Sequence, residues 1–220
     1  MSEHLTLEVI DEECAMREAL DDDAHGSRER FLKTAVFAGG ALAAGGILIG
    51  GLPKVAWAKP SPKQDADILN LVLLLEFLEA EFYAEASRRG RLRGELRQFS
   101  RIVGAHERAH VAFLKKALGR SARKKPTFDF GNATLDPVLF AATATTLEDT
   151  GVAAYNGQAT NLTRGALEAA ATIVSVEARH AAWIRGIIRD RAAEQATDRS
   201  QTKAEALRAV RQTGFVKRAQ

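Results

Sequence analysis

Glutamate, tyrosine and histidine recur in this 220-residue sequence in two sets that share one order and a similar spacing. In each set a glutamate precedes a tyrosine by seven residues, and a Glu-x-x-His follows that glutamate after 31 residues in the first set and 29 in the second. The sets are Glu76, Tyr83, Glu107 and His110, and Glu148, Tyr155, Glu177 and His180. Four carboxylates and two imidazoles without sulfur are the donors that iron or manganese prefers over softer metals.

Helical spacing predicts that these side chains point into a protein core. Residues three apart lie on one face of an α-helix, and so do residues seven apart. Five residues at such spacing form one stripe, which the apolar members mark as buried: Leu69, Val72, Glu76, Glu79 and Tyr83. Buried carboxylates are costly without positive charge. Two divalent cations would neutralise four carboxylates and use both imidazoles.

Other residues near the two sets have simpler interpretations. One Glu-x-x-His alone is more often an exposed chance pair, so the repetition carries the prediction. We expect Glu79 to hydrogen-bond a ligand, and His106 and Asp149 to lie on the surface. Phe113 and Trp183, each three residues after a motif histidine, are predicted core aromatics.

The remaining sequence predicts an all-α protein. Only five prolines and few aromatic residues accompany abundant alanine, which favours helices. We expect five helices, at about 65–90, 92–118, 136–159, 163–192 and from 202 to before 214. The first of them starts near Asp65. The first two and the next two have tight connections and form antiparallel hairpins. Residues 119–134 could span roughly 50 Å at ~3.3 Å per residue, the length of a bundle.

These features together resemble the ferritin-like di-iron carboxylate proteins over residues 65–195. That resemblance implies an antiparallel four-helix bundle with one long crossover and a short C-terminal helix. It implies Glu76 and Glu148 as terminal ligands, Glu107 and Glu177 as bridging ligands, and His110 and His180 as imidazole ligands. Tyr83 and Tyr155 become candidate catalytic residues that hydrogen-bond a carboxylate across the core. Four segments are similar to a bacterial group of exported, desiccation-related ferritin-like proteins: 75–83, 106–114, 176–185 and 203–215.

Residues 1–58 read as an acidic tail followed by an export signal. Residues 34–52 carry no charge, basic residues precede them, and Ala56-Trp57-Ala58 is a small-x-small cleavage pattern. Residues 27–33 resemble a twin-arginine signal peptide, although Glu29 stands where the second arginine is expected. We therefore expect a periplasmic or cell-envelope location, or alternatively a membrane anchor at residues 34–52. Residues 59–64 would be a linker, 65–195 the bundle, and 196–220 a tail with a short helix.

Cysteine and charge exclude some classes of function. The single cysteine is Cys14, so residues 15–220 can hold neither a disulfide framework nor a thiolate metal site. The formal net charge is +3, and the residues after Ala58 hold 26 of the 31 basic but only 18 of the 28 acidic residues. No basic run interleaved with aromatics predicts specific nucleic-acid binding. The surplus indicates a solvated basic surface, or attraction to anionic cell-envelope polymers.

Three functions stay open at this point. One is an oxidoreductase of the ferroxidase or peroxidase type, with two iron ions (alternatively manganese), dioxygen or peroxide, and an external reductant. A second is metal binding or storage with little turnover. The third is a structural protein of the stress response or desiccation protection, in which metal only stabilises the bundle. A homo-oligomer is compatible with each of them.

Overall fold

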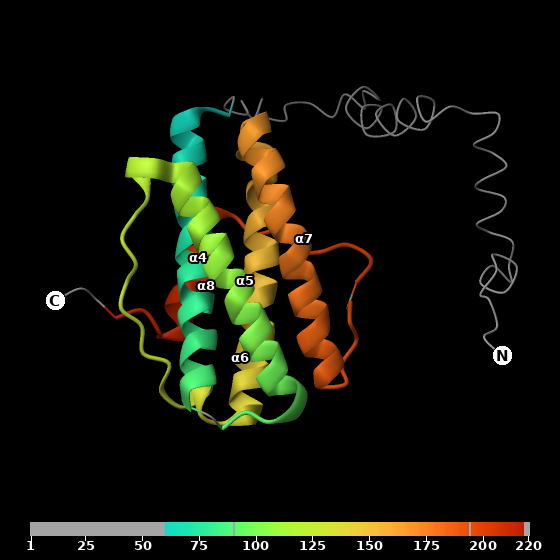
Figure 1. The fold of residues 1–220 in the computed structure, drawn as a ribbon. Coiled ribbons are helices and arrows are strands. Elements are labelled where there is room, and N and C mark those ends of the chain that lie inside the picture. The colour runs from blue at the N-terminus through green and yellow to red at the C-terminus, as the bar shows by residue number, and fades with distance from the viewer. Residues whose placement is uncertain (1–59, 90, 194, 218–220) are drawn as a thin grey trace, which may run out of the picture. The chain divides into compact units, whose positions relative to one another are not determined.

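The computed structural model describes residues 60–89, 91–193 and 195–217, and these ranges contain five α-helices (Figure 1). The helices are α4 Pro62–Arg89, α5 Gly94–Leu118, α6 Pro137–Gln158, α7 Arg164–Ile187 and α8 Lys203–Thr213. Single 3-10 turns, η1 Gly119–Ser121, η2 Gly131–Thr134 and η3 Ala159–Asn161, lie in the connections. No helix in the described part of the chain has the length and apolar character needed to cross a membrane. The predicted export signal lies outside the described residues.

Helices α4 to α7 stand side by side as a bundle (Figure 1). Short connections make α4 and α5 one antiparallel hairpin, and α6 and α7 another. The connection between α5 and α6 runs along the outside of the bundle from one end to the other, so α5 and α6 point the same way (Figure 1). The predicted all-α bundle with one long crossover is confirmed.

Local capping explains where several helices begin. The Asp136 carboxylate accepts hydrogen bonds from the backbone N–H groups of Val138 and Leu139 at 2.8 and 2.9 Å, and Pro137 occupies the first turn of α6. Thr202 and Glu205 form the capping box that starts α8. These starts agree with the sequence prediction, because a cap depends on residues only a few positions apart.

Two helix ends differ from the prediction. Helix α4 starts at Pro62, and the Asp65 carboxylate accepts the Thr163 backbone N–H at 2.8 Å, so it stabilises the start of α7 instead. Helix α7 ends at Ile187, five residues before the predicted Ala192. Arg189 there adopts the left-handed conformation, with φ 59°, and Asp190 N–H donates to the Arg185 carbonyl at 2.9 Å. The left-handed position that ends a helix is usually occupied by glycine. Because arginine stands there, the sequence did not indicate this helix end.

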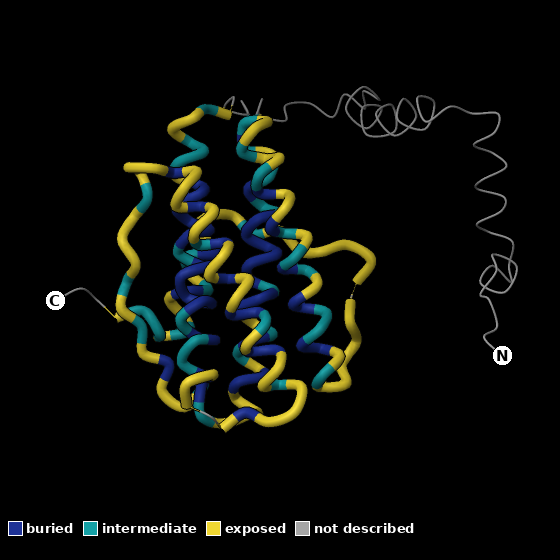
Figure 2. The backbone as a smooth tube through the Cα atoms, in the orientation of Figure 1, coloured by how far each residue is buried: buried dark blue, intermediate teal, exposed yellow. Residues whose placement is uncertain are grey.

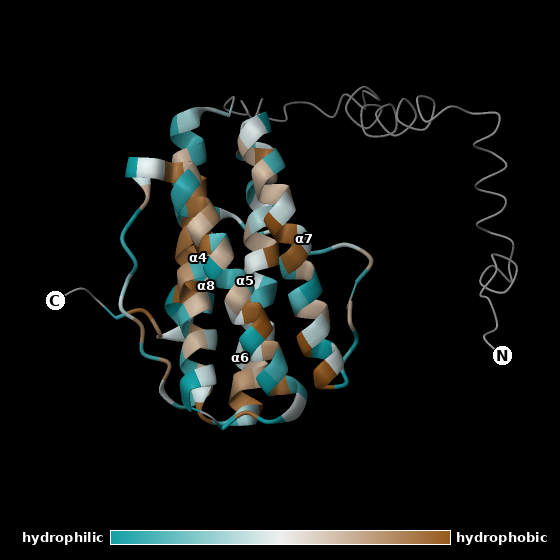
Figure 3. Ribbon diagram, in the orientation of Figure 1, coloured by the Kyte–Doolittle hydropathy of each residue, from teal (hydrophilic) through white to brown (hydrophobic). Residues whose placement is uncertain are grey.

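Apolar clusters fill the two halves of the bundle and leave a polar layer between them. The first cluster lies around aromatic residues, among them Phe82, Phe99 and Phe140. The second includes Phe77 and aliphatic residues of α4, α5 and α7, among them Leu73. Buried positions run along the inside of all four helices (Figure 2), and each helix carries hydrophobic and hydrophilic residues (Figure 3). Burial of the apolar faces stabilises the bundle and holds the polar layer in place.

Helix α8 shares a core with the bundle. Its Ala206 and Val210 are buried with Leu71 and Leu75 of α4 and Ala154 of α6. The segment after α8 also joins the crossover, because Asp129 N–H donates to the Phe215 carbonyl at 2.9 Å and Lys217 N–H to the Thr127 carbonyl at 2.9 Å. Residues 203–217, which the sequence analysis assigned to a tail, therefore belong to the folded unit.

Candidate metal centre

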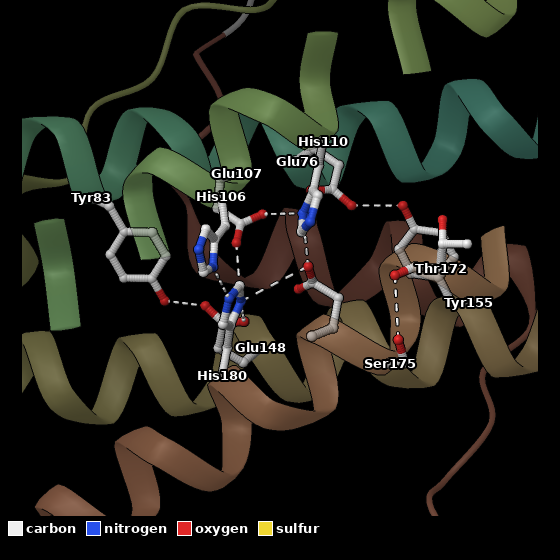
Figure 4. Close-up of polar contacts among 11 residues, drawn as sticks. Glu76, Tyr83, His106, Glu107, His110, Glu148, Tyr155, Thr172, Ser175 and His180 are labelled. Atoms are coloured by element: carbon white, nitrogen blue, oxygen red, sulfur yellow. Dashed lines mark hydrogen bonds and ion pairs between the residues drawn. The ribbon is translucent and has the colours of Figure 1, made fainter. Parts of the chain in front are cut away.

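The polar layer of the bundle contains all six predicted ligands. Helix α4 contributes one glutamate, α6 another, and α5 and α7 each contribute a glutamate and a histidine (Figure 4). The side chains are 0 to 9 % exposed: Glu76, Glu107, His110, Glu148, Glu177 and His180. The structure thus brings together residues that are up to 104 positions apart in the chain.

His110 stands at the centre of the first group. Its Nδ1 atom lies 3.2 Å from Glu76 Oε2, 3.1 Å from Glu107 Oε2 and 3.0 Å from Glu177 Oε1. One Nδ1–H cannot point at three oxygens at once, so the hydrogen bonds of His110 with Glu76 and Glu107 are shared and the four atoms converge on one small volume. The four residues could hold a metal ion, since one ligand atom from each lies within 4.8 Å of the others.

His180 has the same place in the second group. Its Nδ1 atom lies 3.1 Å from Glu107 Oε1, 3.3 Å from Glu148 Oε2 and 4.0 Å from Glu177 Oε1. These four residues could also hold a metal ion. The two groups share Glu107 and Glu177, so the geometry provides two adjacent positions, each with one glutamate and one histidine of its own.

Several buried atoms of the cluster lack a hydrogen-bond partner among the described residues. They are Glu79 Oε2, Glu107 Oε1, Glu148 Oε2, both Glu177 carboxylate oxygens and His180 Nδ1. Glu107 Oε1 and His180 Nδ1 are close but not aligned as donor and acceptor. Buried polar atoms without partners are costly and rare. Carboxylate oxygens and imidazole nitrogens fit divalent cations, which would satisfy those of the atoms that belong to the two four-residue groups.

The charges of the cluster shift its protonation. Burial, followed by repulsion from neighbouring carboxylates, raises the pKa of Glu177 well above the usual range. Burial likewise raises the pKa of Glu107, although its hydrogen bond with His110 opposes the rise. Burial alone would lower the pKa of His110, but its contacts with the carboxylates of Glu107, Glu177 and Glu76 raise it to about 12. The folded protein therefore needs bound protons or bound cations at this cluster.

Both predicted tyrosines contact a carboxylate from the opposite half of the sequence. Tyr155 Oη donates to Glu76 Oε1 at 2.7 Å, and Tyr83 Oη donates to Glu148 Oε1 (Figure 4). Burial first, and the adjacent carboxylate second, raise the pKa of each phenol, so both stay protonated donors. The tyrosines hold the two unshared glutamates in orientation.

Glu79 is a fifth buried carboxylate beside the six predicted ligands. It is 1 % exposed, as the stripe on α4 predicted. Burial first, and then the charges of the other glutamates, raise the pKa of its carboxyl well above the usual range. A Cβ atom added to Gly151 would lie 3.5 Å from Glu79 Oε1 and 3.3 Å from Glu177 Oε2, so the glycine leaves room for both.

Of the surface and core predictions, the one for Phe113 is wrong, and those for His106 and Asp149 lacked a contact. His106 is exposed, as expected, but its Nδ1 atom lies 2.8 Å from Nε2 of the buried His180, a contact that the sequence analysis missed. Asp149 is paired with the buried Arg185 and not simply solvated. Phe113 is 43 % exposed, so its prediction as a core aromatic is wrong. Trp183 is partly buried against Phe99.

Comparison with known families supports this geometry. Residues 64–190, more than half of the chain, match the family described as the ferritin-like domain. The matched range begins in α4 and ends just after α7, and it contains all six predicted ligands. A search of the curated proteins found no match.

Proposed function

Since the chain belongs to the ferritin-like family, we propose that its buried carboxylate cluster binds two metal ions, iron or manganese. Glu76 and His110 would hold the first ion, and Glu148 and His180 the second, while Glu107 and Glu177 belong to both groups. The observation that carries this proposal is the pair of four-residue groups that share two glutamates and leave buried oxygens without hydrogen bonds.

The proposal extends to an oxidoreductase activity of the ferroxidase or peroxidase type. Two bound iron or manganese ions would supply one-electron redox chemistry toward dioxygen or peroxide. Ferrous iron is the proposed substrate, and its electrons pass to the oxidant. Turnover of peroxide would need an external reductant, because no cysteine follows Cys14.

The protein's own residues prepare the site for this chemistry. Tyr83 and Tyr155 hold Glu148 and Glu76 by hydrogen bonds, so these carboxylates cannot rotate freely. The aromatic cluster on one side packs around Tyr83, with Phe99 and Phe140 edge-on at 5.7 and 6.0 Å. That packing excludes water from the Tyr83 side of the site.

The location of the protein is a separate part of the proposal. The order of basic residues, uncharged run and small-x-small pattern in residues 1–58 supports export to the periplasm or cell envelope. N-terminal sequencing of the protein from its own host tests this. A mature chain that begins at Lys59 supports a cleaved signal, whereas a chain that retains residues 34–52 and stays with the membrane supports an anchor.

A second function rests on the same buried carboxylates. Metal that merely offsets their charge would stabilise the bundle without turnover, as in a structural stress or desiccation protein. The two functions differ in what happens after loading, because only the enzyme consumes oxidant.

Metal analysis of protein purified from its host is the first test. We expect two iron or manganese ions per chain. A content below one ion per chain, together with no binding of added ferrous iron or Mn²⁺ and no stabilisation by either, would refute the proposal.

Oxidant consumption then separates the enzyme from the structural protein. The protein is first loaded with ferrous iron in the absence of oxygen. Dioxygen or peroxide is then added, and its uptake is followed. Glu107→Ala should abolish turnover if the protein is an enzyme, and should mainly lower the melting temperature if metal is structural. Glu95→Ala is the matched control, because Glu95 is an exposed glutamate on the same helix.

A further inference from the structure

The two halves of the metal centre differ at one contact. His106 Nδ1 lies 2.8 Å from His180 Nε2, and the two rings lie edge to edge, with centroids 5.1 Å apart and an angle of 18° between their planes (Figure 4). In the described structure, the outer Nε2 atom of His110 makes no such hydrogen bond. The residue before Glu107 is His106, whereas the residue before Glu177 is Val176, which has no hydrogen-bonding side chain.

The direction of the His106–His180 hydrogen bond follows from the carboxylates. His180 Nδ1 faces Glu107 Oε1 and Glu148 Oε2, where its lone pair would meet a cation. A neutral imidazole with a free lone pair on Nδ1 carries its hydrogen on Nε2. His180 Nε2 therefore donates and His106 Nδ1 accepts, which leaves the Nε2–H of the exposed His106 directed away from His180.

We infer that His106 is a positioning residue that holds His180 in the orientation and tautomer for metal binding, and that it makes the two metal positions unequal. This inference rests on the proposed function. An acceptor behind a ligating imidazole fixes the ring and increases its basicity, and loss of such partners weakens metal affinity by about 10–100-fold. The position with Glu148 and His180 has this support, and the position with Glu76 and His110 does not.

The relative orientation of the rings is the one that this hydrogen bond requires. The His106 and His180 rings lie edge to edge, with planes 18° apart and centroids 5.1 Å apart, so His106 Nδ1 stands in line with Nε2 of His180. The His110 ring lies on the site side of His180, with centroids 6.2 Å apart and planes at 29°. His180 thus lies between two imidazoles, one exposed and one buried.

The test compares two substitutions at position 106. His106→Phe keeps a flat ring but removes the acceptor, whereas His106→Asn keeps an acceptor oxygen. Gln98→Phe, at an exposed position of the same helix, is the control for adding a surface phenylalanine. Each full-length protein is stripped with a chelator, and Mn²⁺ binding is measured by equilibrium dialysis against a competing chelator.

We expect wild type and Gln98→Phe each to bind two Mn²⁺ ions. Each of the two binding constants should be the same in both proteins. His106→Phe should weaken the binding of one ion by about 10–100-fold and leave the affinity for the other within about twofold of wild type. His106→Asn should keep most of the wild-type affinity for both ions. In ¹⁵N-histidine NMR of the Zn²⁺-loaded protein, the Nε2–H of His180 should be protected from exchange in wild type and lose that protection in His106→Phe.

Other outcomes overturn the inference in distinguishable ways. Two unchanged binding constants in His106→Phe refute the role of His106 alone and leave the proposed function intact. Equal weakening of both ions, or a lower melting temperature of the stripped variant, indicates a general structural role and also refutes it. If wild type itself binds no Mn²⁺, both the inference and the proposed function fail.

Discussion

Removal of metal should make the stability of this protein fall as pH rises. The folded structure raises the pKa of Glu79, Glu107 and Glu177 through burial first, and raises that of His110 to about 12 through its carboxylate partners. Each of these groups binds a proton more tightly in the folded than in the unfolded chain. Their contribution to stability is therefore complete below the unfolded pKa and is lost as pH rises toward the folded pKa.

The pH window follows from the unfolded values. The glutamates begin to lose their contribution above about pH 4.5, and His110 above about pH 6.5. Each extra proton held by the folded state changes the unfolding free energy by about 1.4 kcal/mol per pH unit. If two of the three glutamates keep their protons in the folded state, the free energy of unfolding falls by about 5 kcal/mol from pH 5 to 7. That is a large share of the 5–15 kcal/mol by which folded proteins are usually stable.

Bound metal should reverse this trend, because a cation replaces the protons and binds more tightly as they leave. The assay is urea unfolding, followed by circular dichroism at pH 5, 6 and 7, for chelator-treated and Mn²⁺-loaded protein. The midpoint should fall with pH in the first sample and rise in the second. A chelator-treated midpoint that is constant or rises between pH 5 and 7 would refute the reasoning.

A matched pair of variants ties the effect to the cluster. Glu107→Gln removes one raised carboxyl and should flatten the slope of the chelator-treated protein by up to about 1.4 kcal/mol per pH unit. Glu95→Gln changes an exposed glutamate of the same helix and should leave the slope as in wild type. Equal slopes in the two variants would mean that the pH dependence comes from elsewhere in the protein.

Two further predictions concern stability. Tyr155→Phe removes the 2.7 Å hydrogen bond to buried Glu76 and should cost about 1–3 kcal/mol in urea unfolding of the chelator-treated protein; no loss would mean that the phenol does not hold this carboxylate. Gly157→Ala would place a Cβ atom 1.9 Å from the Gln201 carbonyl oxygen, so it should lower the melting temperature and expose residues 195–202 to protease. Gly165→Ala, whose Cβ meets nothing within 4 Å, should leave the melting temperature and the protease resistance of residues 195–202 unchanged. An equal loss of stability in Gly165→Ala and Gly157→Ala would contradict the steric explanation.

Sequence reasoning succeeded where neighbouring residues decide the structure. The caps at Asp136 and Thr202 and the stripe that buries Glu76 depend on side chains within one or two turns. It failed at the end of α7, because Arg189 takes a backbone conformation that glycine usually signals. It also treated α8 as part of a tail, because the apolar face of a short helix does not reveal what it packs against.

His106 shows the same limit within the site. Its position on α5 correctly predicted an exposed side chain, one step away from the face that carries Glu107. Its partner His180 lies 74 residues later on another helix, and only the packing of α5 beside α7 brings the two rings together. The spacing of residues along either helix does not indicate this contact.

The sequence by itself determined the kinds of candidate ligand, their order and the helix face on which each stands, because covalent spacing on a regular helix sets these directly. The tertiary structure decided which atoms of different helices meet. It made Glu107 and Glu177 common to both groups and directed each tyrosine to the carboxylate of the other half. Among the described residues, it also gave the Nε2 atom of His180, but not that of His110, a hydrogen-bonding partner. The physical reason is that the rotation and height of each helix are set by the two apolar clusters, whose packing depends on the whole bundle.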